Sequence, residues 1–253
     1  MAKSHAQQDL IVQLAHELRE PLAALRGAME VLRRCGGEPD VMNWVCESLD
    51  RQTSQMSRLI DDLLAVSSEH RGRIHLHKQL VDLETIVKGA VDTTSASMMR
   101  RAQKVAISMP DGPLTIQVDP NALMQVLTNL LANASKFTQP SGRIELRATR
   151  EQDSLVLCVS DNGMGIATRD LPHLFDRFWQ SSRNDASAAG GMGIGLAVSR
   201  QLVEAHGGTI EATSDGPGHG STFVVRFPQE SWAASAADFP VQPAAAPSAV
   251  QER

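Results

Sequence analysis

Apolar side chains recur at spacings of three and four residues along the N-terminal part of the chain, which is the period of an amphipathic helix. The first stripe comprises Ile11, Leu14, Leu18, Leu22, Leu25, Met29 and Leu32, and the second comprises Val45, Leu49, Met56, Leu59, Leu63 and Val66. We therefore predict helices over residues 7–34 and 41–70, separated by the turn-forming residues 35–40.

Two amphipathic helices of one chain cannot bury both stripes by themselves. Antiparallel pairing, followed by twofold association with a second copy, would bury both stripes in a four-helix bundle. The alternative is that both helices fold onto the downstream part of the chain, which needs no second copy. Because stripes of this length are typical of helix bundles, we predict a homodimer formed through the helical hairpin.

After residue 72 the pattern changes to short strands that alternate with helices. Predicted strands cover residues 77–83, 104–109, 114–119, 144–149, 155–160, 209–213 and 222–227, and predicted helices cover residues 84–101, 120–137 and 194–206. A long excursion rich in glycine and serine occupies residues 161–193. This alternation predicts a two-layer α/β sandwich with a mixed sheet, and the whole chain is then of the α+β class.

The chain divides into three expected parts. Residues 1–72 form the helical hairpin, and residues 73–228 form the α/β sandwich. From residue 229 to residue 253 alanine, proline and serine dominate and few large apolar side chains remain. We predict that this tail is disordered, because it has too little apolar surface to form a core.

Composition narrows the class of protein. With 253 residues, of which 42% are hydrophobic, the chain has room for one or two packed domains. Its net charge of −5 and the absence of a Lys/Arg block argue against nucleic acid as a partner. The cysteines Cys35, Cys46 and Cys158 lie far apart without metal-ligand spacing, as in an intracellular protein. No run of about 18 apolar residues occurs, so we expect no membrane segment in this chain and a cytoplasmic location.

His16 lies off the apolar stripe of the first predicted helix. The simplest interpretation is a solvated surface histidine. Its neighbours favour a chemical role, because Glu17 can hydrogen-bond one ring nitrogen and leave the other as a nucleophile. Pro21 has no N–H to donate to the Glu17 carbonyl, so the helix is expected to bend beside His16.

Polar side chains share one face of the predicted helix over residues 120–137. Asn129, Asn133 and Lys136 follow one another at spacings of four and three residues. A carboxamide oxygen is a suitable ligand for Mg²⁺, and a lysine ammonium supplies a point charge for phosphate. The alternative is an ordinary solvent-facing side of an amphipathic helix.

Two glycine-rich segments follow in the sequence. Asp161 comes directly after an apolar predicted strand, and Gly163 and Gly165 after it would let a ligand approach the backbone. Residues 190–195, Gly-Gly-Met-Gly-Ile-Gly, lead into a predicted helix, whose first N–H groups can receive phosphate. Residues 174–179, Leu-Phe-Asp-Arg-Phe-Trp, form an apolar patch in the loop between them.

Residues 16–22, His-Glu-Leu-Arg-Glu-Pro-Leu, resemble the H-box of sensor histidine kinases. The segments 129–136, 161–166, 174–179 and 190–196 resemble, in order and spacing, the four sequence boxes of the catalytic domain of that family. This ATP-binding fold, the Bergerat fold, is shared with gyrase, Hsp90 and MutL. The resemblance implies ATP-dependent autophosphorylation on His16, assisted by Glu17. It also implies transfer of the phosphoryl group to an aspartate in the receiver domain of a response regulator.

The same resemblance assigns the ligands of ATP and Mg²⁺. By this likeness Asn133 would coordinate Mg²⁺, and Asp161 would bind the adenine. The other expected ATP-binding residues are Asn129, Lys136, Gly163, Gly165, Arg177, Gly191, Gly193, Gly195 and Ser221. Residues 166–192 would form a lid over the nucleotide.

Three positions depart from the commonest pattern of the family. Ala15 stands where Ser is frequent, and Met192 stands where Thr or Ser is frequent. Neither replacement removes an essential group. Glu20 stands four residues after His16, where many relatives carry a Thr or Asn that orients water for dephosphorylation of the partner. We therefore expect weak phosphatase activity.

Two other classes remain as alternatives. An ATPase clamp of the gyrase, Hsp90 and MutL kind uses water as its nucleophile and has no use for His16 and Glu17. A catalytically silent dimeric scaffold would have lost Asn133, Asp161 or the glycines, and this chain keeps them.

Overall fold

The structure is a computed structural model that describes residues 19, 21–34, 38, 41–46, 48–49, 52–53, 56, 74–151, 154–180 and 193–228. In the N-terminal part, residues 21–34 and 41–46 are helical. Ala28 and Val45 are buried there, whereas Leu22, Met29 and Trp44 are about half exposed. Among the helices of the described ranges, none has the length and hydropathy needed to span a bilayer.

A two-stranded antiparallel sheet opens the second part of the chain. Strand β1 (Gln79–Asp82) pairs with β3 (Thr115–Val118), with Gln79 opposite Val118. Helix α3 (Leu83–Arg100) follows β1 directly. Asp82 accepts a hydrogen bond from the Glu84 N–H and so satisfies one of the free donors at the start of that helix.

The main sheet has five strands in the order β2-β4-β5-β7-β6. They are β2 (Lys104–Ser108), β4 (Arg143–Arg150), β5 (Ser154–Asp161), β7 (Ser221–Pro228) and β6 (Thr209–Thr213). The β2–β4 pair is parallel, and the three other pairs are antiparallel. The pairing of β5 with β7 places Asp161 opposite Ser221, although the two residues are far apart in sequence.

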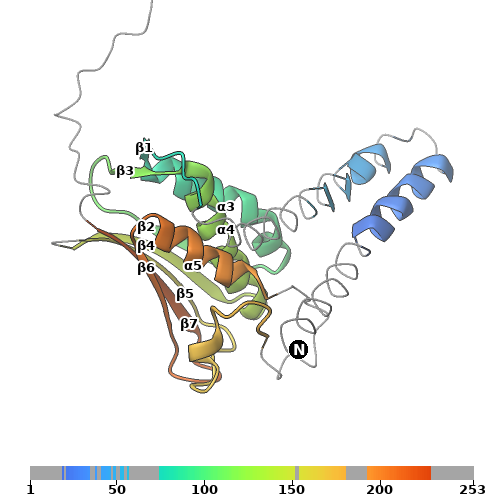
Figure 1. Ribbon diagram of the computed structural model, residues 1–253. Helices are drawn as coiled ribbons and strands as arrows, with labels where there is room; N and C mark the ends of the chain where they lie inside the picture. The colour runs from blue at the N-terminus through green and yellow to red at the C-terminus, as the bar shows by residue number, and fades with distance from the viewer. Residues whose placement is uncertain are drawn as a thin grey trace, which may run out of the picture.

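Helices α3, α4 (Pro120–Phe137) and α5 (Gly195–Ala205) lie together on one face of this sheet (Figure 1). Side chains alternate in and out along each strand, so every second residue faces the helices. The largest fully buried side chains of this core include Leu127, Leu130, Leu146, Leu157 and Phe227. Burial of each such side chain contributes roughly 1.5–3 kcal/mol, and this layer is what holds the ends of α4 and α5 in place.

Helix α4 has strong signals at its start. Asp119 accepts hydrogen bonds from the N–H groups of Asn121 and Ala122, and Pro120 occupies the first turn, where no N–H is needed. Its buried face is formed by residues spaced three and four apart, namely Leu123, Val126, Leu127, Leu130, Leu131 and Ala134. The polar side of this helix is thereby turned away from the core.

The predicted α+β architecture with a mixed sheet is confirmed, and the predicted helix over residues 120–137 coincides with α4. The predicted strand over residues 209–213 likewise coincides with β6, and each of the other elements differs at one or both ends by one or two residues. The predicted strand over residues 77–83 is shorter, because Leu83 already begins α3. The sequence pattern did not separate the β1–β3 ribbon from the main sheet, since strand pairing depends on contacts between distant segments.

Candidate functional site

The polar face of α4 carries three of the predicted site residues. Asn129, Asn133 and Lys136 are each partly exposed. The Asn129 amide donates to the Gly195 carbonyl at 3.2 Å and to the Ser199 hydroxyl at 3.4 Å, and therefore ties α4 to α5. The Asn133 side chain makes no hydrogen bond within the part of the chain that the structure describes. Its amide oxygen is thus oriented by α4 and open to a ligand, as a hard cation such as Mg²⁺ requires.

Lys136 lies in the last turn of α4, next to Phe137. Its ammonium is 4.9 Å from the centre of the Phe137 ring, a distance at which a cation and an aromatic face attract. The side chain is therefore held near the end of the helix.

Asp161 is the last residue of β5, in the middle of the main sheet. One carboxylate oxygen accepts the Gly163 N–H at 2.8 Å, and the other accepts the Ser221 hydroxyl at 2.6 Å. Two donors on opposite oxygens fix the plane of the carboxylate. Ser221, at the start of β7, is buried and positions Asp161 from the neighbouring strand.

Residues 163–166 are packed against the loop between β6 and β7. The Gly218 N–H donates to the Met164 carbonyl at 2.7 Å, and the Gly220 N–H donates to the Gly163 carbonyl at 3.2 Å. Gly165 has a φ of 68°, and a side chain there would overlap the Gly216 carbonyl. Sequence reasoning missed this loop. The glycine-rich run Gly216-Pro217-Gly218-His219-Gly220 is the feature of the sequence that could have indicated it.

The start of α5 is open at its N-terminus. Its N-cap residue, Ile194, makes no side-chain capping bond. The first N–H groups of the helix therefore receive no bond from the N-cap side chain, and the N–H groups at such a helix start can bind phosphate. Gly193 has a φ of 65° and accepts the Phe178 N–H through its carbonyl, which joins the start of α5 to the preceding loop.

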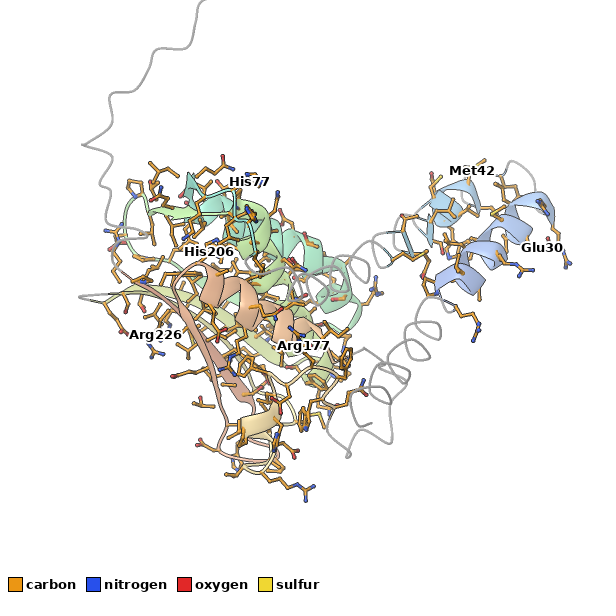
Figure 2. The ribbon with its side chains drawn as sticks, viewed as in Figure 1. Glu30, Met42, His77, Arg177, His206 and Arg226 are labelled. Carbon is orange, nitrogen blue, oxygen red and sulfur yellow. The ribbon has the colours of Figure 1, made fainter. Side chains whose placement is uncertain are left out.

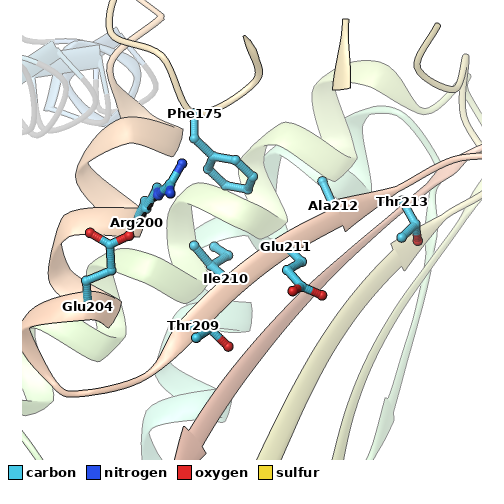
Figure 3. A pocket seen from close by; sticks show the side chains of 8 residues that line it. All are labelled: Phe175, Arg200, Glu204, Thr209, Ile210, Glu211, Ala212 and Thr213. Carbon is cyan, nitrogen blue, oxygen red and sulfur yellow. Dashed lines mark hydrogen bonds and ion pairs between the residues drawn. The ribbon is translucent and has the colours of Figure 1, made fainter. Parts of the chain in front are cut away.

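The loop between β5 and α5 contains the short helix η2 (Leu171–His173) and the apolar patch after it. Phe175 packs on α5, with the Arg200 guanidinium 5.9 Å from its ring centre. It lines a groove of about 440 Å³ together with Arg200 and Glu204 of α5 and the residues of β6 (Figure 3). None of the residues that line this groove is a predicted ATP-binding residue. Arg177, in the same loop, is partly exposed and is labelled in Figure 2.

The start of α4 and the end of α5 are joined through a buried histidine. His206, at the end of α5, is 5% exposed, and its Nδ1 lies 2.6 Å from the Leu202 carbonyl oxygen. A carbonyl only accepts, so Nδ1 carries the proton and Nε2 accepts the Asp119 N–H at 3.0 Å. Asp119 also accepts the His77 N–H at 2.9 Å, and Figure 2 shows His77 and His206 at the same end of the helical layer. Sequence reasoning missed this network.

Four predicted residues lie outside the described ranges, namely His16, Glu17, Glu20 and Gly191. The predicted tail of residues 229–253 and most of the predicted hairpin domain lie outside them as well. Among the described site residues, the fold brings Asp161, Gly163, Gly165 and Ser221 together, and it brings Asn129 to Gly195.

Comparison with known proteins divides the chain into two matched parts. Residues 6–72 match the His Kinase A (phospho-acceptor) domain, and residues 118–231 match the family described as histidine kinase-, DNA gyrase B-, and HSP90-like ATPase. The probable sensor histidine kinase TcrY of Mycobacterium tuberculosis is 34% identical over 225 residues, which cover 89% of this chain and 46% of that protein.

Solved structures agree in fold. The Acinetobacter baumannii histidine kinase AdeS is 25% identical, with a TM-score of 0.59 over 84% of this chain and 97% of that chain. The histidine kinase ThkA, solved in complex with response regulator protein TrrA, is 18% identical, with a TM-score of 0.58 over 90% of this chain and 63% of that chain.

A phospho-acceptor domain followed by an ATPase-like domain is the arrangement of the sensor histidine kinases of two-component systems, and this chain belongs to that family. It spans about half, or less, of the length of the curated relatives that it matches. The ATPase-like domain is the part that binds ATP.

Proposed function

We propose that this chain transfers the γ-phosphoryl group of ATP to His16 and then passes it to an aspartate of a response regulator. The observation that carries this proposal is the Asp161–Ser221–Gly163 contact at the middle of the sheet. It fixes a carboxylate, which can accept a hydrogen bond from the exocyclic amine of adenine, next to a glycine that lets the base approach the backbone. A nucleophilic histidine outside this domain distinguishes a kinase from an ATPase clamp.

The proposed ATP site is formed by the residues around α4, β5 and the start of α5. Adenine binds Asp161, supported by Gly163, Gly165 and Ser221 behind it. The phosphates bind near Asn129, Lys136 and Arg177, and Gly191, Gly193 and Gly195 supply backbone on the phosphate side of the site. The phosphate side is supported by the start of α5, where the N-cap residue Ile194 makes no side-chain bond that would compete with phosphate oxygens.

The proposal also includes Mg²⁺, with Asn133 as its ligand. The half-buried Asn133 amide has no partner among the described residues, and α4 holds it in place. A magnesium ion bound there would neutralise charge on the phosphate oxygens.

The chemical step is an in-line displacement. One ring nitrogen of His16 forms a bond to the γ-phosphorus as the bond from that phosphorus to the β–γ bridging oxygen breaks, which releases ADP. Glu17 accepts a hydrogen bond from the other ring nitrogen and so keeps the attacking nitrogen unprotonated. The rest of the catalytic effect comes from positioning and from the charges around the phosphates.

The proposed partners are a second copy of the chain and a response regulator. Leu22, Met29 and Trp44 leave apolar surface exposed on a single copy of the helical region, and this supports burial against a second copy. The response regulator is supported by ThkA, whose structure was solved in complex with TrrA. The proposed domains are residues 1–72, 73–228 and the unpacked tail 229–253.

The test is incubation with γ-labelled ATP and Mg²⁺, followed by acid and alkali treatment of the labelled protein. The proposal expects label that is labile in acid and stable in alkali, and that is lost in His16→Gln. His75→Gln, which changes an exposed histidine outside the proposed site, should label like the wild type. Phosphate release without protein label would instead identify an ATPase, and the absence of both would identify a silent scaffold.

A further inference from the structure

The two loops behind the proposed adenine site hold each other almost entirely through backbone atoms. Residues 163–166 follow β5, and residues 214–220 connect β6 to β7. They approach so closely that a side chain at Gly165 would overlap the Gly216 carbonyl, and one at Gly220 would overlap the Asp161 carbonyl. Glycine permits this approach, but it adds no side-chain contact to hold the loops together.

Ser214 supplies the side chain that joins the two loops. Its hydroxyl accepts the Ile166 N–H at 3.0 Å and the Gly216 N–H at 3.3 Å, and it donates to the Gly220 carbonyl at 2.6 Å. One hydroxyl has one proton and two acceptor positions, so it can make these three bonds together. The Gly216 carbonyl, at 3.4 Å, lies farther from the hydroxyl than the Gly220 carbonyl, which therefore takes the proton. Ser214 therefore fixes its own loop and the loop after Asp161 at the same time.

The bond to Ile166 connects Ser214 to the proposed nucleotide site. Ile166 ends the stretch that contains Gly163 and Gly165, and Gly163 donates its N–H to the Asp161 carboxylate. On the other side, Gly220 immediately precedes Ser221, whose hydroxyl holds the second oxygen of that carboxylate. The Ser214 hydroxyl thus constrains the backbone on both sides of Asp161 without touching Asp161.

We propose that Ser214 is a positioning residue for the nucleotide: its hydroxyl holds the two glycine-rich loops in the arrangement that orients Asp161 toward adenine. This inference rests on the proposed function of the Asp161 site. It concerns binding of the nucleotide and leaves the phosphoryl transfer step unaffected, since among the described residues no Ser214 hydrogen bond reaches α4 or the start of α5.

Ser214→Ala removes the acceptor of two N–H groups and the donor to one carbonyl. Loss of such bonds in a partly buried place weakens the arrangement, and we expect ADP to bind about five- to tenfold more weakly by calorimetric titration. Ser214→Thr keeps the hydroxyl and should bind ADP within about twofold of the wild type. Ser95→Ala, whose hydroxyl bonds only its own helix on an exposed face, is the matched control and should bind like the wild type.

Two further measurements separate positioning from a general loss of stability. Autophosphorylation should show a raised KM for ATP in Ser214→Ala with kcat at saturating ATP within about twofold of the wild type. Amide exchange should become faster at Ile166 and Gly216 while the amides of α4 keep their protection.

Several results would overturn the inference. ADP binding by Ser214→Ala as tight as that of the wild type would do so. A Thr variant as weak as the Ala variant would show that the hydroxyl is not the cause. If the affinity for ADP depends on Ser214 but γ-labelled ATP never labels His16, the proposed kinase function fails and the role of Ser214 in nucleotide binding stands. A wild-type chain that binds no nucleotide overturns both.

Discussion

Residues of the same type have different surroundings on α4. Asn129 donates to Gly195 and Ser199 of α5, so its amide is part of the contact between two helices. Asn133, one helical turn further along, has no such partner among the described residues. A cation binds the amide oxygen, and Asn129 uses its Nδ2 group for both bonds, so α5 fixes the direction of its oxygen. The Asn133 amide has no such constraint and can turn toward a cation, and Asn133 is the proposed Mg²⁺ ligand.

This difference leads to a prediction at the residue scale. Asn133→Ala should reduce autophosphorylation at least about 100-fold, because electrostatic stabilisation of the phosphates is lost. Asp161→Ala should do the same through loss of adenine binding. Labelling with γ-labelled ATP measures the effect, and analytical ultracentrifugation should find the dimer unchanged. Asn121→Ala, at an exposed position near the start of the same helix, is the control. Wild-type rates in either site variant would refute the assignment.

At the scale of elements, α5 is fastened to α4 at both of its ends, once at the middle of α4 and once at its start. Near the site, Asn129 bonds the first residue of α5, and Ser199, which is fully buried, donates to the same Gly195 carbonyl at 2.9 Å. At the far end, His206 joins the end of α5 to the start of α4 through Asp119. Two helices fixed at two points cannot pivot independently, so Gly195, a proposed phosphate-binding residue, stays beside the polar face of α4.

The far contact involves two groups with shifted pKa values. Burial lowers the pKa of His206 below its usual 6.5, opposed by its bond to Leu202 and by the Asp119 carboxylate. Burial alone would raise the pKa of Asp119, but hydrogen bonds from the N–H groups of His77, Ala122 and Asn121 lower it overall. Both groups are therefore held in their unprotonated forms in the folded protein.

Stability should consequently fall on acidification. Because the folded-state pKa of His206 is lowered, the unfolded chain binds more protons below 6.5, and the stabilisation present above 6.5 is lost as the pH falls toward the folded pKa. Protonation of Nε2 would also remove the acceptor of the Asp119 N–H. Asp119 adds a second loss in more acidic solution, below its usual 3.8.

His206→Leu tests this contact. The variant leaves the Asp119 N–H without its acceptor, so the free energy of unfolding should drop by about 1–3 kcal/mol at neutral pH. Its unfolding free energy should also change less than that of the wild type between about pH 7.5 and about pH 5.5. Urea denaturation at each pH measures both quantities, with the exposed His75→Leu as control. An equal dependence on pH in His206→Leu and wild type would contradict the role of His206.

At the scale of the whole molecule, β7 ends at Pro228, which is the last residue that the structure describes. The sequence beyond it offers Trp232, Phe239, Val241 and Val250 as its larger apolar residues. So few side chains would not offset the conformational entropy lost on ordering 25 residues, as counted from residue 229 to 253. The tail is thus proposed to add nothing to the core.

Removal of residues 229–253 should therefore leave the molecule intact. The melting temperature should stay within about 2 °C of that of the full chain. The autophosphorylation rate should also be unchanged, because no proposed site residue lies in the tail. Differential scanning calorimetry and the labelling assay measure these quantities. A fall of several degrees would show that the tail packs against the domain.

For the part of the chain that the structure describes, the sequence alone determined the order and type of the elements, and it singled out the proposed ligand-binding residues. The periods of its apolar residues predicted the mixed α+β fold, and the start of α4 was placed correctly because Asp119 and Pro120 are local signals. Asp161 and the glycines were chosen on the same local basis, from a carboxylate at the end of an apolar strand and from backbone freedom.

Only the tertiary structure decided which of these residues act together. Pairing of β5 with β7 sets Ser221 on Asp161, and packing of α4 on α5 sets Asn129 on Gly195 and Asp119 on His206. Ser214 carried no signal of its own, because a serine before a glycine-rich turn has no fixed partner until two loops distant in sequence are brought together. Sequence periodicity reports which face of an element is buried, whereas the partner on that face is chosen by how the elements pack.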